Sequence, residues 1–412
     1  MTKPAEQTER QLLHNEIEDI FDPKVHLNYT PPASLLTMKD LGLKGSNTST
    51  SIAGSVPFPF LSETGVRAYR RSLMRPHILK SCAKSYGAGT FILRNLAKHS
   101  KFISDLWTHP ETMRIVSEVA GVPLTIIMPT EIGHTNIQTA GGTVDDLMRE
   151  LDVEPRANCV CVDEQNGYDP LRESAVIPWH YDSYPYVAVL MLSDTTHMTG
   201  GETYIRKGDG SAVKVKGPSL GHCVMLQGGQ VEHLAARAFG TTERITTITS
   251  YCAAIPGLYD DSYISNVRPY CNLPELYTEW SNYRLEKMKQ EIENIQATII
   301  QHVSRDRDSF PLDEVYHFAE QQISYLKRTA RQMVDQTLCA EVRRHFGVRE
   351  INATSEKSGN VSFVYSQQGT FSWDQYRLEE YLFGDELLRQ GLKEVLLAWL
   401  HRSDLLNLEK DS

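Results

Sequence analysis

The sequence predicts a mainly β core, a small barrel or jelly roll, with flanking helices before and after it (an α+β class). Short apolar or Thr- and Ile-rich runs, typical of strands, occur at 187–192, 213–215 and 245–251. Glycine pairs at 200–201 and 228–229 separate these runs as turns. Apolar residues at spacings of three and four, typical of amphipathic helices, lie in the segments on either side. Several short strands with frequent turns indicate a barrel-like all-β core.

The chain divides into three expected regions. Residues 1–60 are predicted to form an N-terminal arm and connector, 61–270 the β domain with supporting helices, and 271–412 a mostly helical C-terminal extension. Helices are expected from Ser62 and from His99 to Val119. The run 124–138 reads as one strand entering the barrel. Helical periodicity returns in 285–299 and 315–333, and we expect these apolar faces to cap the barrel or to form a homodimer contact.

Composition excludes several classes of protein. Among 412 residues, 42 Lys and Arg against 52 Asp and Glu give a net charge of −10, which argues against a nucleic-acid partner. The polar first 25 residues contain no secretory signal. No apolar run approaches the roughly 18 residues of a membrane span, so we expect no membrane partner and a cytoplasmic location.

Cysteine usage agrees with an intracellular protein. The seven cysteines are spread thinly and form neither a C-x-x-C pair nor a disulfide ladder. The close pair Cys159 and Cys161 is interpreted as two small residues on one face of a strand, with metal binding as the weaker alternative. We expect reduced thiols throughout.

The candidate metal-binding residues lie in the stretch from 177 to 251. His180 and Asp182 are two residues apart, so in an extended strand they point to the same side. A distant His233 would complete a 2-His-1-carboxylate face, which leaves open positions and suits non-haem Fe(II). Zinc is less natural, because its structural sites close all four positions and usually include cysteine.

In order and spacing, this stretch resembles the Fe(II)- and 2-oxoglutarate-dependent oxygenases, including fungal-type members that act on small molecules. The matching segments are His180-Tyr181-Asp182, Gly200 to Thr203, Gly221 to His233, and Arg244 to Thr246, within about 75 residues. The resemblance implies a double-stranded β-helix fold and iron bound by His180, Asp182 and His233. It further implies that Arg244, helped by Thr203 and Thr246, binds the distal carboxylate of 2-oxoglutarate, which suits a planar guanidinium.

The implied activity is oxidation of an unactivated C–H bond with O2, releasing succinate and CO2, with ascorbate in support. Hydroxylation, desaturation and cyclisation all use the same protein residues, and no side-chain acid or base beyond the metal ligands is required. The resemblance suggests a small-molecule substrate, such as an amino acid or a natural-product intermediate.

Each assignment has an alternative. His180 and His233 could be ordinary hydrogen-bonded histidines, and Arg244 could form a surface ion pair with Glu243. Arg237 is a second candidate for the 2-oxoglutarate carboxylate.

Candidate substrate residues come from two stretches. His134, Asn136 and Gln138 share one face of a strand and either line the pocket or simply belong to a half-exposed strand. Tyr181 and Tyr184 are candidates because they adjoin the iron motif. Tyr186 is expected to pack the barrel.

Two other functions fit parts of the pattern. One is a non-haem iron oxidase that uses no 2-oxoglutarate, and Arg244 in its expected place speaks against it. The other is a non-catalytic metal-binding β-barrel scaffold, which would have no reason to keep three ligands. No G-x-S-x-G elbow supports a hydrolase.

Overall fold

A computed structural model describes residues 18–87, 89–139, 141–155, 169, 171, 177–239, 243–265, 267–268 and 271–333, with the backbone of 348–352, 360–365 and 370–374. The interpretation of the Cys159–Cys161 pair lies outside these residues, and so does the part of the predicted helical extension beyond residue 374. The chain forms two compact units, Met1–Ser262 with Tyr270–Asn294, and Tyr263–Pro269 with Ile295–Ser412. The three-region division proposed from the sequence remains a prediction.

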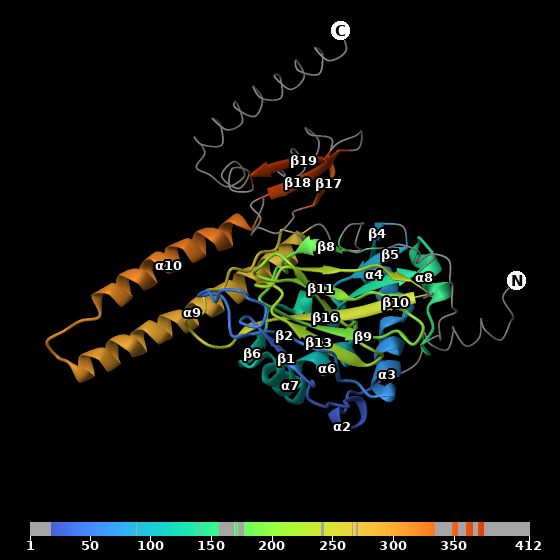
Figure 1. The fold of residues 1–412 in the computed structure, drawn as a ribbon, viewed down its shortest axis with the longest axis horizontal. Helices are drawn as coiled ribbons and strands as arrows, with labels where there is room; N and C mark the ends of the chain where they lie inside the picture. Colours follow the sequence, from blue (N-terminus) through green and yellow to red (C-terminus); the bar gives the residue numbers. More distant parts are fainter. Residues whose placement is uncertain are drawn as a thin grey trace, which may run out of the picture. The chain divides into compact units, whose positions relative to one another are not determined.

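The first unit contains two main antiparallel sheets (Figure 1). In spatial order the large sheet consists of β1 (Leu35–Thr37), β2 (Ile52–Ser55), β13 (His222–Leu226), β9 (Tyr186–Met191), β16 (Glu243–Ala253), β7 (His134–Thr139), β5 (Thr90–Leu93) and β4 (Ala83–Gly87). Two short strands join it, β3 (Phe58–Pro59) beside β13 and β6 (Leu124–Ile126) beside β16.

The second sheet has the spatial order β12 (Ala212–Val215), β11 (Thr203–Arg206), β14 (His233–Ala235) and β8 (Ile177–His180). A further short pair joins β10 (Thr199–Gly200) to β15 (Ala238–Phe239).

The path of the chain defines the fold. From β7 onward the strands pass between the two sheets, with β7, β9, β13 and β16 in the large sheet and β8, β11, β12 and β14 in the second. The resulting orders, β7-β16-β9-β13 and β8-β14-β11-β12, are those of a double-stranded β-helix, a relative of the jelly roll. Apolar side chains of both sheets pack together in one cluster, which includes Val187, Ile205, Val215 and Leu226. The predicted fold class, a jelly-roll core with flanking helices, is confirmed.

Helices cover the other face of the large sheet (Figure 1). They are α2 (Pro23–His26), α3 (Glu63–Leu73), α4 (Pro76–Cys82), α5 (Leu96–His99), α6 (Lys101–Thr108), α7 (Pro110–Ala120) and α8 (Val144–Glu150). Their starts follow from capping: the Ser62 hydroxyl accepts from the Gly65 amide at 3.0 Å, and Thr143 forms a capping box with Asp146.

The central strand β16 contacts the helical layer with one face and turns its other face toward the second sheet. Its residues Ile245 and Tyr251 belong to the core shared with the helices, and Thr247 Oγ1 lies 2.7 Å from Tyr69 Oη of α3. Because side chains alternate along a strand, Arg244, Thr246 and Ile248 face the second sheet. We call this side the interior face.

One sequence expectation was wrong in detail. The run 124–138 is not a single strand but β6, a 3-10 turn over Pro129–Glu131 (η1), and β7. Pro129 has no amide hydrogen for a ladder, and Gly133 has φ +66°. A Cβ at Gly133 would lie 2.7 Å from Tyr69 Oη, so only glycine fits where β7 passes α3.

The N-terminal segment contributes strands to the large sheet. β1 pairs with β2, and β2 and β3 both pair with β13. The Gln227 side chain accepts from the Thr50 amide at 3.0 Å and donates to the Ile52 carbonyl at 2.6 Å. The predicted arm therefore forms one edge of this sheet.

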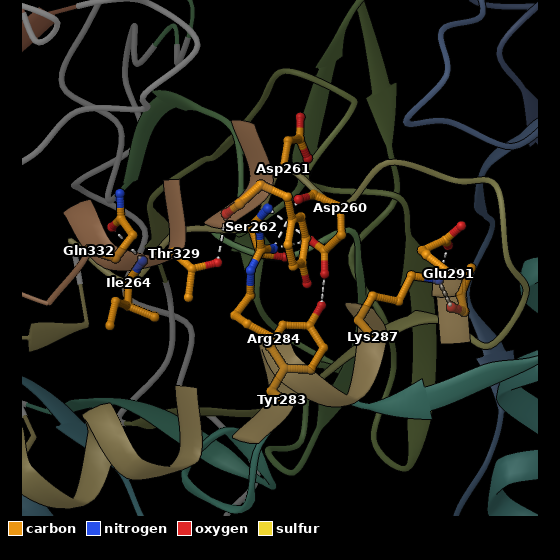
Figure 2. Close-up of polar contacts among 12 residues, drawn as sticks. Asp260, Asp261, Ser262, Ile264, Tyr283, Arg284, Lys287, Glu291, Thr329 and Gln332 are labelled. Atoms are coloured by element: carbon orange, nitrogen blue, oxygen red, sulfur yellow. Dashed lines mark hydrogen bonds and ion pairs between the residues drawn. The ribbon is translucent and has the colours of Figure 1, made fainter. Parts of the chain in front are cut away.

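The long helix α9 (Leu273–Arg305) starts in the first unit, where a buried polar network anchors it (Figure 2). Arg284 is fully buried, and its Nη1 lies 3.3 Å from Asp260 Oδ1 and donates to the Asp260 carbonyl at 2.9 Å. The Tyr283 hydroxyl donates to the same carboxylate. Lys287 Nζ donates to the Ile255 carbonyl at 2.7 Å, just beyond β16. An ion pair and hydrogen bonds to backbone carbonyls therefore anchor the start of α9.

The second unit contains the rest of α9, then α10 (Leu312–Arg331) and the small antiparallel sheet β17 (Val348–Asn352), β18 (Asn360–Tyr365) and β19 (Thr370–Asp374). Within this unit the Ile264 amide donates to Gln332 Oε1 at 3.1 Å (Figure 2). Among the described helices, none combines the length and the apolar character of a membrane span.

We expect Asp260→Ala to destabilise the protein by about 3–5 kcal/mol, because it removes the carboxylate that compensates the buried Arg284 charge. Urea unfolding of the full-length protein measures the change. Asp105→Ala, which removes the exposed ion pair with Lys101, is the control and should have little effect. Equal effects of the two substitutions would contradict the structural role of Asp260.

Candidate metal centre

Two histidines meet where the second sheet pairs β8 with β14. His180 ends β8, His233 begins β14, and the two are direct partners in the antiparallel register. Directly opposed residues place their side chains on the same face, and the two imidazole rings have centroids 4.2 Å apart. Residues 53 positions apart in the chain therefore reach one point because of the strand register.

Asp182 completes the group from just beyond the end of β8. Its Oδ1 lies 3.6 Å from Nε2 of His180 and 3.6 Å from Nε2 of His233. The sequence argument assumed that the strand continues through Asp182, whereas β8 ends at His180. A different contact holds Asp182 in position: its amide donates to the Gly228 carbonyl at 3.0 Å.

The three side chains offer a suitable set of metal donors. In the part of the chain that the structure describes, His180, Asp182 and His233 form the group whose donor atoms all lie within 4.8 Å of one another. His233 Nδ1 lies 2.9 Å from the Val231 carbonyl, which fixes the tautomer with Nδ1–H donating and the Nε2 lone pair facing Asp182. This donor set fits a divalent metal with open coordination positions.

Protonation states also favour metal binding. Burial, reinforced by His180, lowers the pKa of His233 to about 4, so this imidazole is neutral at physiological pH. Burial alone would raise the pKa of Asp182, but His233 and His180 together bring it below its usual value. His233 and Asp182 are thus in the deprotonated forms that a metal requires.

Gly228 leaves the space that the Asp182 carboxylate occupies. A Cβ on Gly228 would lie 1.8 Å from Asp182 Oδ2, a distance that non-bonded atoms cannot adopt. The glycine pair 228–229, identified from the sequence only as a turn, therefore has a second role beside the metal ligands.

Arg244 lies on the interior face of β16, and its neighbour Glu243 lies on the opposite face. There Glu243 Oε1 is 2.7 Å from Nη2 of the fully buried Arg70, which also donates from Nη1 to the Leu192 carbonyl at 2.7 Å. The alternative of a surface ion pair between Arg244 and Glu243 therefore does not fit the structure.

The Arg244 guanidinium has the features of an anion site. Its Nε is buried and makes no hydrogen bond to any described residue. Burial lowers the pKa of Arg244 to about 10, which still leaves it charged at neutral pH. A half-buried cation with an unbonded buried donor and no carboxylate partner among the described residues is costly, so the arrangement fits a carboxylate ligand.

A glycine lies close to Arg244, and two threonines lie on the same interior side of their strands. A Cβ on Gly201 would lie 3.4 Å from Arg244 Nε, so β11 begins close to the guanidinium. Thr203 lies two residues before the interior residue Ile205 in β11 and so shares its face, and Thr246 lies two residues after Arg244 on the interior face of β16. The carbonyl of Arg237 accepts from the Gly201 amide at 2.9 Å. The roles of these residues toward 2-oxoglutarate remain predictions.

The polar face of β7 turns toward the interior. His134, Asn136 and Gln138 are the direct partners of Ile248, Thr246 and Arg244 in β16. Opposed residues share a face, so all three side chains lie on the interior side. This supports pocket lining over a solvent-exposed strand face, while substrate binding by these residues remains a prediction.

The two candidate tyrosines have different surroundings. Tyr181 has Glu232 and Arg206 as its charged neighbours, and Arg206 alternates with the interior Ile205, so Tyr181 belongs to the outer side of the second sheet. Tyr184 is buried beside Glu131, and burial followed by that carboxylate raises its pKa well above 10. Their roles toward substrate remain predictions.

Sequence reasoning missed several residues of this region, namely Arg70, Arg94, Glu131 and Gly228. Arg70 and Arg94 look like ordinary surface arginines, and no spacing rule relates them to Glu243 or Glu131. Glu131 follows Pro129 in an apolar run, and an isolated acid in such a run is a signal that could have indicated a buried carboxylate.

The sequence matches no protein-family model and no curated protein. Among solved structures the chain is similar to the non-heme α-ketoglutarate-dependent epimerase SnoN from nogalamycin biosynthesis, with 16% identity, 47% of this chain and 75% of that chain covered, and a TM-score of 0.33. It is also similar to the non-heme α-ketoglutarate-dependent carbocyclase SnoK from nogalamycin biosynthesis (18% identity, 54% and 88% covered, TM-score 0.33). HygX from Streptomyces hygroscopicus, with nickel and 2-oxoglutarate bound, gives 17% identity, 48% and 82% coverage and a TM-score of 0.29.

We expect Gly228→Ala to weaken metal binding by roughly 10- to 100-fold, because the added methyl group displaces the Asp182 carboxylate. Calorimetric titration with Mn(II), a redox-stable stand-in for Fe(II), measures the affinity. Gly45→Ala is the matched control, since a Cβ there meets nothing within 4 Å. Unchanged affinity in Gly228→Ala would show that Asp182 is not held against this glycine.

We expect the metal-free protein to lose stability as the pH falls from 6.5 to about 4, the unfolded and folded pKa values of His233. In this window the unfolded chain binds a proton that the folded state does not, so unfolding becomes easier as protons are added. The loss attributable to His233 is about 3 kcal/mol at most. Urea unfolding at several pH values, with chelator present, measures it.

His233→Gln should make the free energy of unfolding less dependent on pH. The control His197→Gln, at an exposed position, should leave this dependence unchanged. Burial, followed by Arg94, also lowers the pKa of His134, so part of the slope should persist in His233→Gln. An identical slope in wild type and His233→Gln would contradict a buried, neutral His233.

Proposed function

We propose that this protein is a non-haem Fe(II)- and 2-oxoglutarate-dependent oxygenase of the double-stranded β-helix type. The observation that carries the proposal is the combination of a 2-His-1-carboxylate face with a half-buried arginine on the interior face of β16, whose buried Nε makes no hydrogen bond to any described residue. A structural metal site would account for the first feature but not for the second.

His180, Asp182 and His233 would hold Fe(II). Three ligands on one side leave room for a chelating co-substrate and for O2, which favours iron over a closed zinc site. No cysteine belongs to the donor group, which also argues against structural zinc.

Arg244 would bind the distal carboxylate of 2-oxoglutarate, with Thr203 and Thr246 as additional hydroxyl donors. Charge balance supports this pairing: Fe(II), one aspartate and one arginine leave two positive charges, and 2-oxoglutarate carries two negative charges. The complex would therefore be neutral. Without the co-substrate, the half-buried guanidinium of Arg244 lacks this compensation.

The bound iron, 2-oxoglutarate and O2 would supply the oxidation of an unactivated C–H bond, with release of succinate and CO2 and with ascorbate in support. The protein's own part is to fix the ligands, to bind the far carboxylate and to position the substrate. We propose a small-molecule substrate, such as an amino acid or a natural-product intermediate, and hydroxylation, desaturation or cyclisation as the outcome.

His134, Asn136, Gln138, Tyr181 and Tyr184 are our candidates for substrate contact, the first three because they share the interior face with Arg244. We further propose that the exposed apolar residues of α9 and α10 form a homodimer contact. They include Ile300, Tyr316 and Ile323 of the second unit.

The first experiment is succinate release by purified protein with Fe(II), ascorbate, O2 and 2-oxoglutarate, with and without a panel of amino acids and other small metabolites. We expect slow release alone and faster release with a substrate, and His180→Ala serves as the inactive control. Iron binding without any succinate would favour the 2-oxoglutarate-independent oxidase or the non-catalytic scaffold.

We expect Arg244→Ala to raise the 2-oxoglutarate concentration needed for half-maximal succinate release by at least roughly 100-fold, since a charge-assisted bidentate contact contributes several kcal/mol. Metal affinity, measured separately by calorimetry, should remain within about twofold of wild type, since Arg244 is not a ligand. Arg237→Ala is the matched control with a small effect. If Arg237→Ala raises the requirement and Arg244→Ala does not, the carboxylate site belongs to Arg237.

A further inference from the structure

Helix α10 (orange in Figure 1) carries apolar residues on two different faces, and one of these faces is exposed. The covered face is half-buried near the start of the helix and buried toward its end. Its members are Val315, Phe318, Gln322, Tyr325 and Thr329. Their spacings of three and four are those of an ordinary amphipathic helix that packs on one side.

The exposed face is a continuous row of apolar residues, which we call the α10 stripe. Its members recur at alternating spacings of four and three and are Leu312, Tyr316, Ala319, Ile323, Leu326 and Ala330. All six are exposed, and the four large side chains keep between 41% and 62% of their surface accessible. The spacings average 3.5 residues, the period of a helix that pairs with another helix in a coiled coil.

Helix α9 does not continue this row. Within the second unit its exposed large apolar residues are Ile300 and Val303. The next position toward the N-terminus at a spacing of four is Gln296, which is polar and exposed. The longest apolar surface of the described second unit therefore belongs to α10 alone.

Charged residues accompany the α10 stripe. Asp313, Glu320 and Lys327 each directly follow a stripe residue, and all three are exposed. None of them forms an ion pair with another described residue. The first turn of the helix is acidic, and its last turn is basic through Arg328 and Arg331. The flanking charges therefore change sign from one end of the stripe to the other.

We infer that two copies of this chain pair through their α10 stripes, with the two helices antiparallel and related by a two-fold axis. Antiparallel pairing places the acidic first turn of each helix beside the basic last turn of the other. Parallel pairing would bring like charges and like ends of the helix dipoles together. A two-fold axis requires one surface to be complementary to itself, and the α10 stripe meets this requirement.

The stripe also determines the register of the pair. Aligned with its own antiparallel copy, it forms apolar layers throughout, which join Ala319 to Ile323, Tyr316 to Leu326, and Leu312 to Ala330 of the second copy. Each layer occurs twice because of the symmetry. A shift by one residue would place charged positions in these layers, so this register is favoured.

The same register decides which flanking charges meet. Asp313 lies beside Lys327 of the second copy at both ends of the pair, and these contacts are attractive. Glu320 lies beside its own copy at the two-fold axis, where like charges repel. Glu320→Gln should therefore strengthen the dimer by roughly two- to fivefold.

This inference goes beyond the proposed oxygenase activity. All of its residues belong to the second compact unit, whereas the metal ligands and Arg244 belong to the first. It specifies the helix, the orientation and the register of a homodimer contact. Substitutions in the stripe should therefore change association and leave the affinity for Mn(II) unchanged.

Sedimentation equilibrium of the full-length protein tests the pairing. We expect a dimer for the wild-type chain and a monomer for Ile323→Glu, which places a charge in both central layers. Because Ile323 is exposed, the circular dichroism spectrum of this variant should match that of the wild type.

A charge exchange tests the register. Asp313→Lys should weaken the dimer roughly 10-fold, since it replaces attraction by repulsion at two symmetric places. Adding Lys327→Asp to the same chain restores opposite charges and should recover most of the affinity. Glu314→Lys is the matched control: it makes the same change of charge one position farther around the helix, away from the stripe, and should have little effect.

A short bismaleimide crosslinker tests the orientation, with the wild-type chain as background for the native cysteines. An equal mixture of Leu312→Cys and Ala330→Cys chains should give crosslinked dimers above this background. Leu312→Cys chains by themselves should not, because antiparallel pairing places the two copies of residue 312 at opposite ends.

Three outcomes would overturn the proposal. A monomeric wild-type chain would leave the stripe to another segment of this chain or to a different partner. Crosslinking of Leu312→Cys with itself would mean parallel pairing, and equal weakening by Asp313→Lys and Glu314→Lys would exclude the register. Succinate release separates this inference from the proposed function. A dimer without succinate release would contradict only the oxygenase, whereas succinate release by a monomer would contradict only the pairing.

Discussion

The alternation of side chains along β16 is the constraint on which the rest of the structure depends. This strand is central in the large sheet, with β9 on one side and β7 on the other. One set of its residues packs into the helical layer through Ile245, Thr247 and Tyr251, and the other set faces the second sheet with Arg244 and Thr246. A shift of one residue in register would exchange the two sets and move Arg244 into the helix-packed core.

Charged side chains are paired on the helical side of β16 and incompletely paired on its interior side. Toward the helices, Arg70 and Glu243 pair directly, and backbone carbonyls such as that of Leu192 satisfy further donors of Arg70. In the interior, Arg244 Nε is buried without a hydrogen bond to any described residue, and the two histidines face the Asp182 carboxylate. Fully paired charges stabilise a fold, whereas incompletely satisfied ones mark places where a ligand completes the interactions.

Local sequence signals predicted the strands and helices well where the periodicity was strong. Short apolar runs gave β9 and β12, and Ser62 before an amphipathic stretch gave α3, because alternation and capping are local properties. The run 124–138 was predicted as one strand because its apolar composition hides the turn at Pro129 and Gly133. The strand pairs formed by the N-terminal segment also had no local signal, because edge pairing is a long-range contact.

The sequence by itself determined which residue types can form the candidate site: His180 and Asp182 at close spacing, His233 after a glycine-rich turn, and Arg244 in a strand beyond it. Only the tertiary structure decided how they meet, because the β8–β14 register brings two histidines together from 53 positions apart. The tertiary structure also decided three contacts. Gly228 leaves space for the Asp182 carboxylate, Arg70 forms an ion pair with Glu243, and Glu131 lies beside His134. These contacts join distant segments whose approach depends on the packing of whole layers, so no local pattern encodes them.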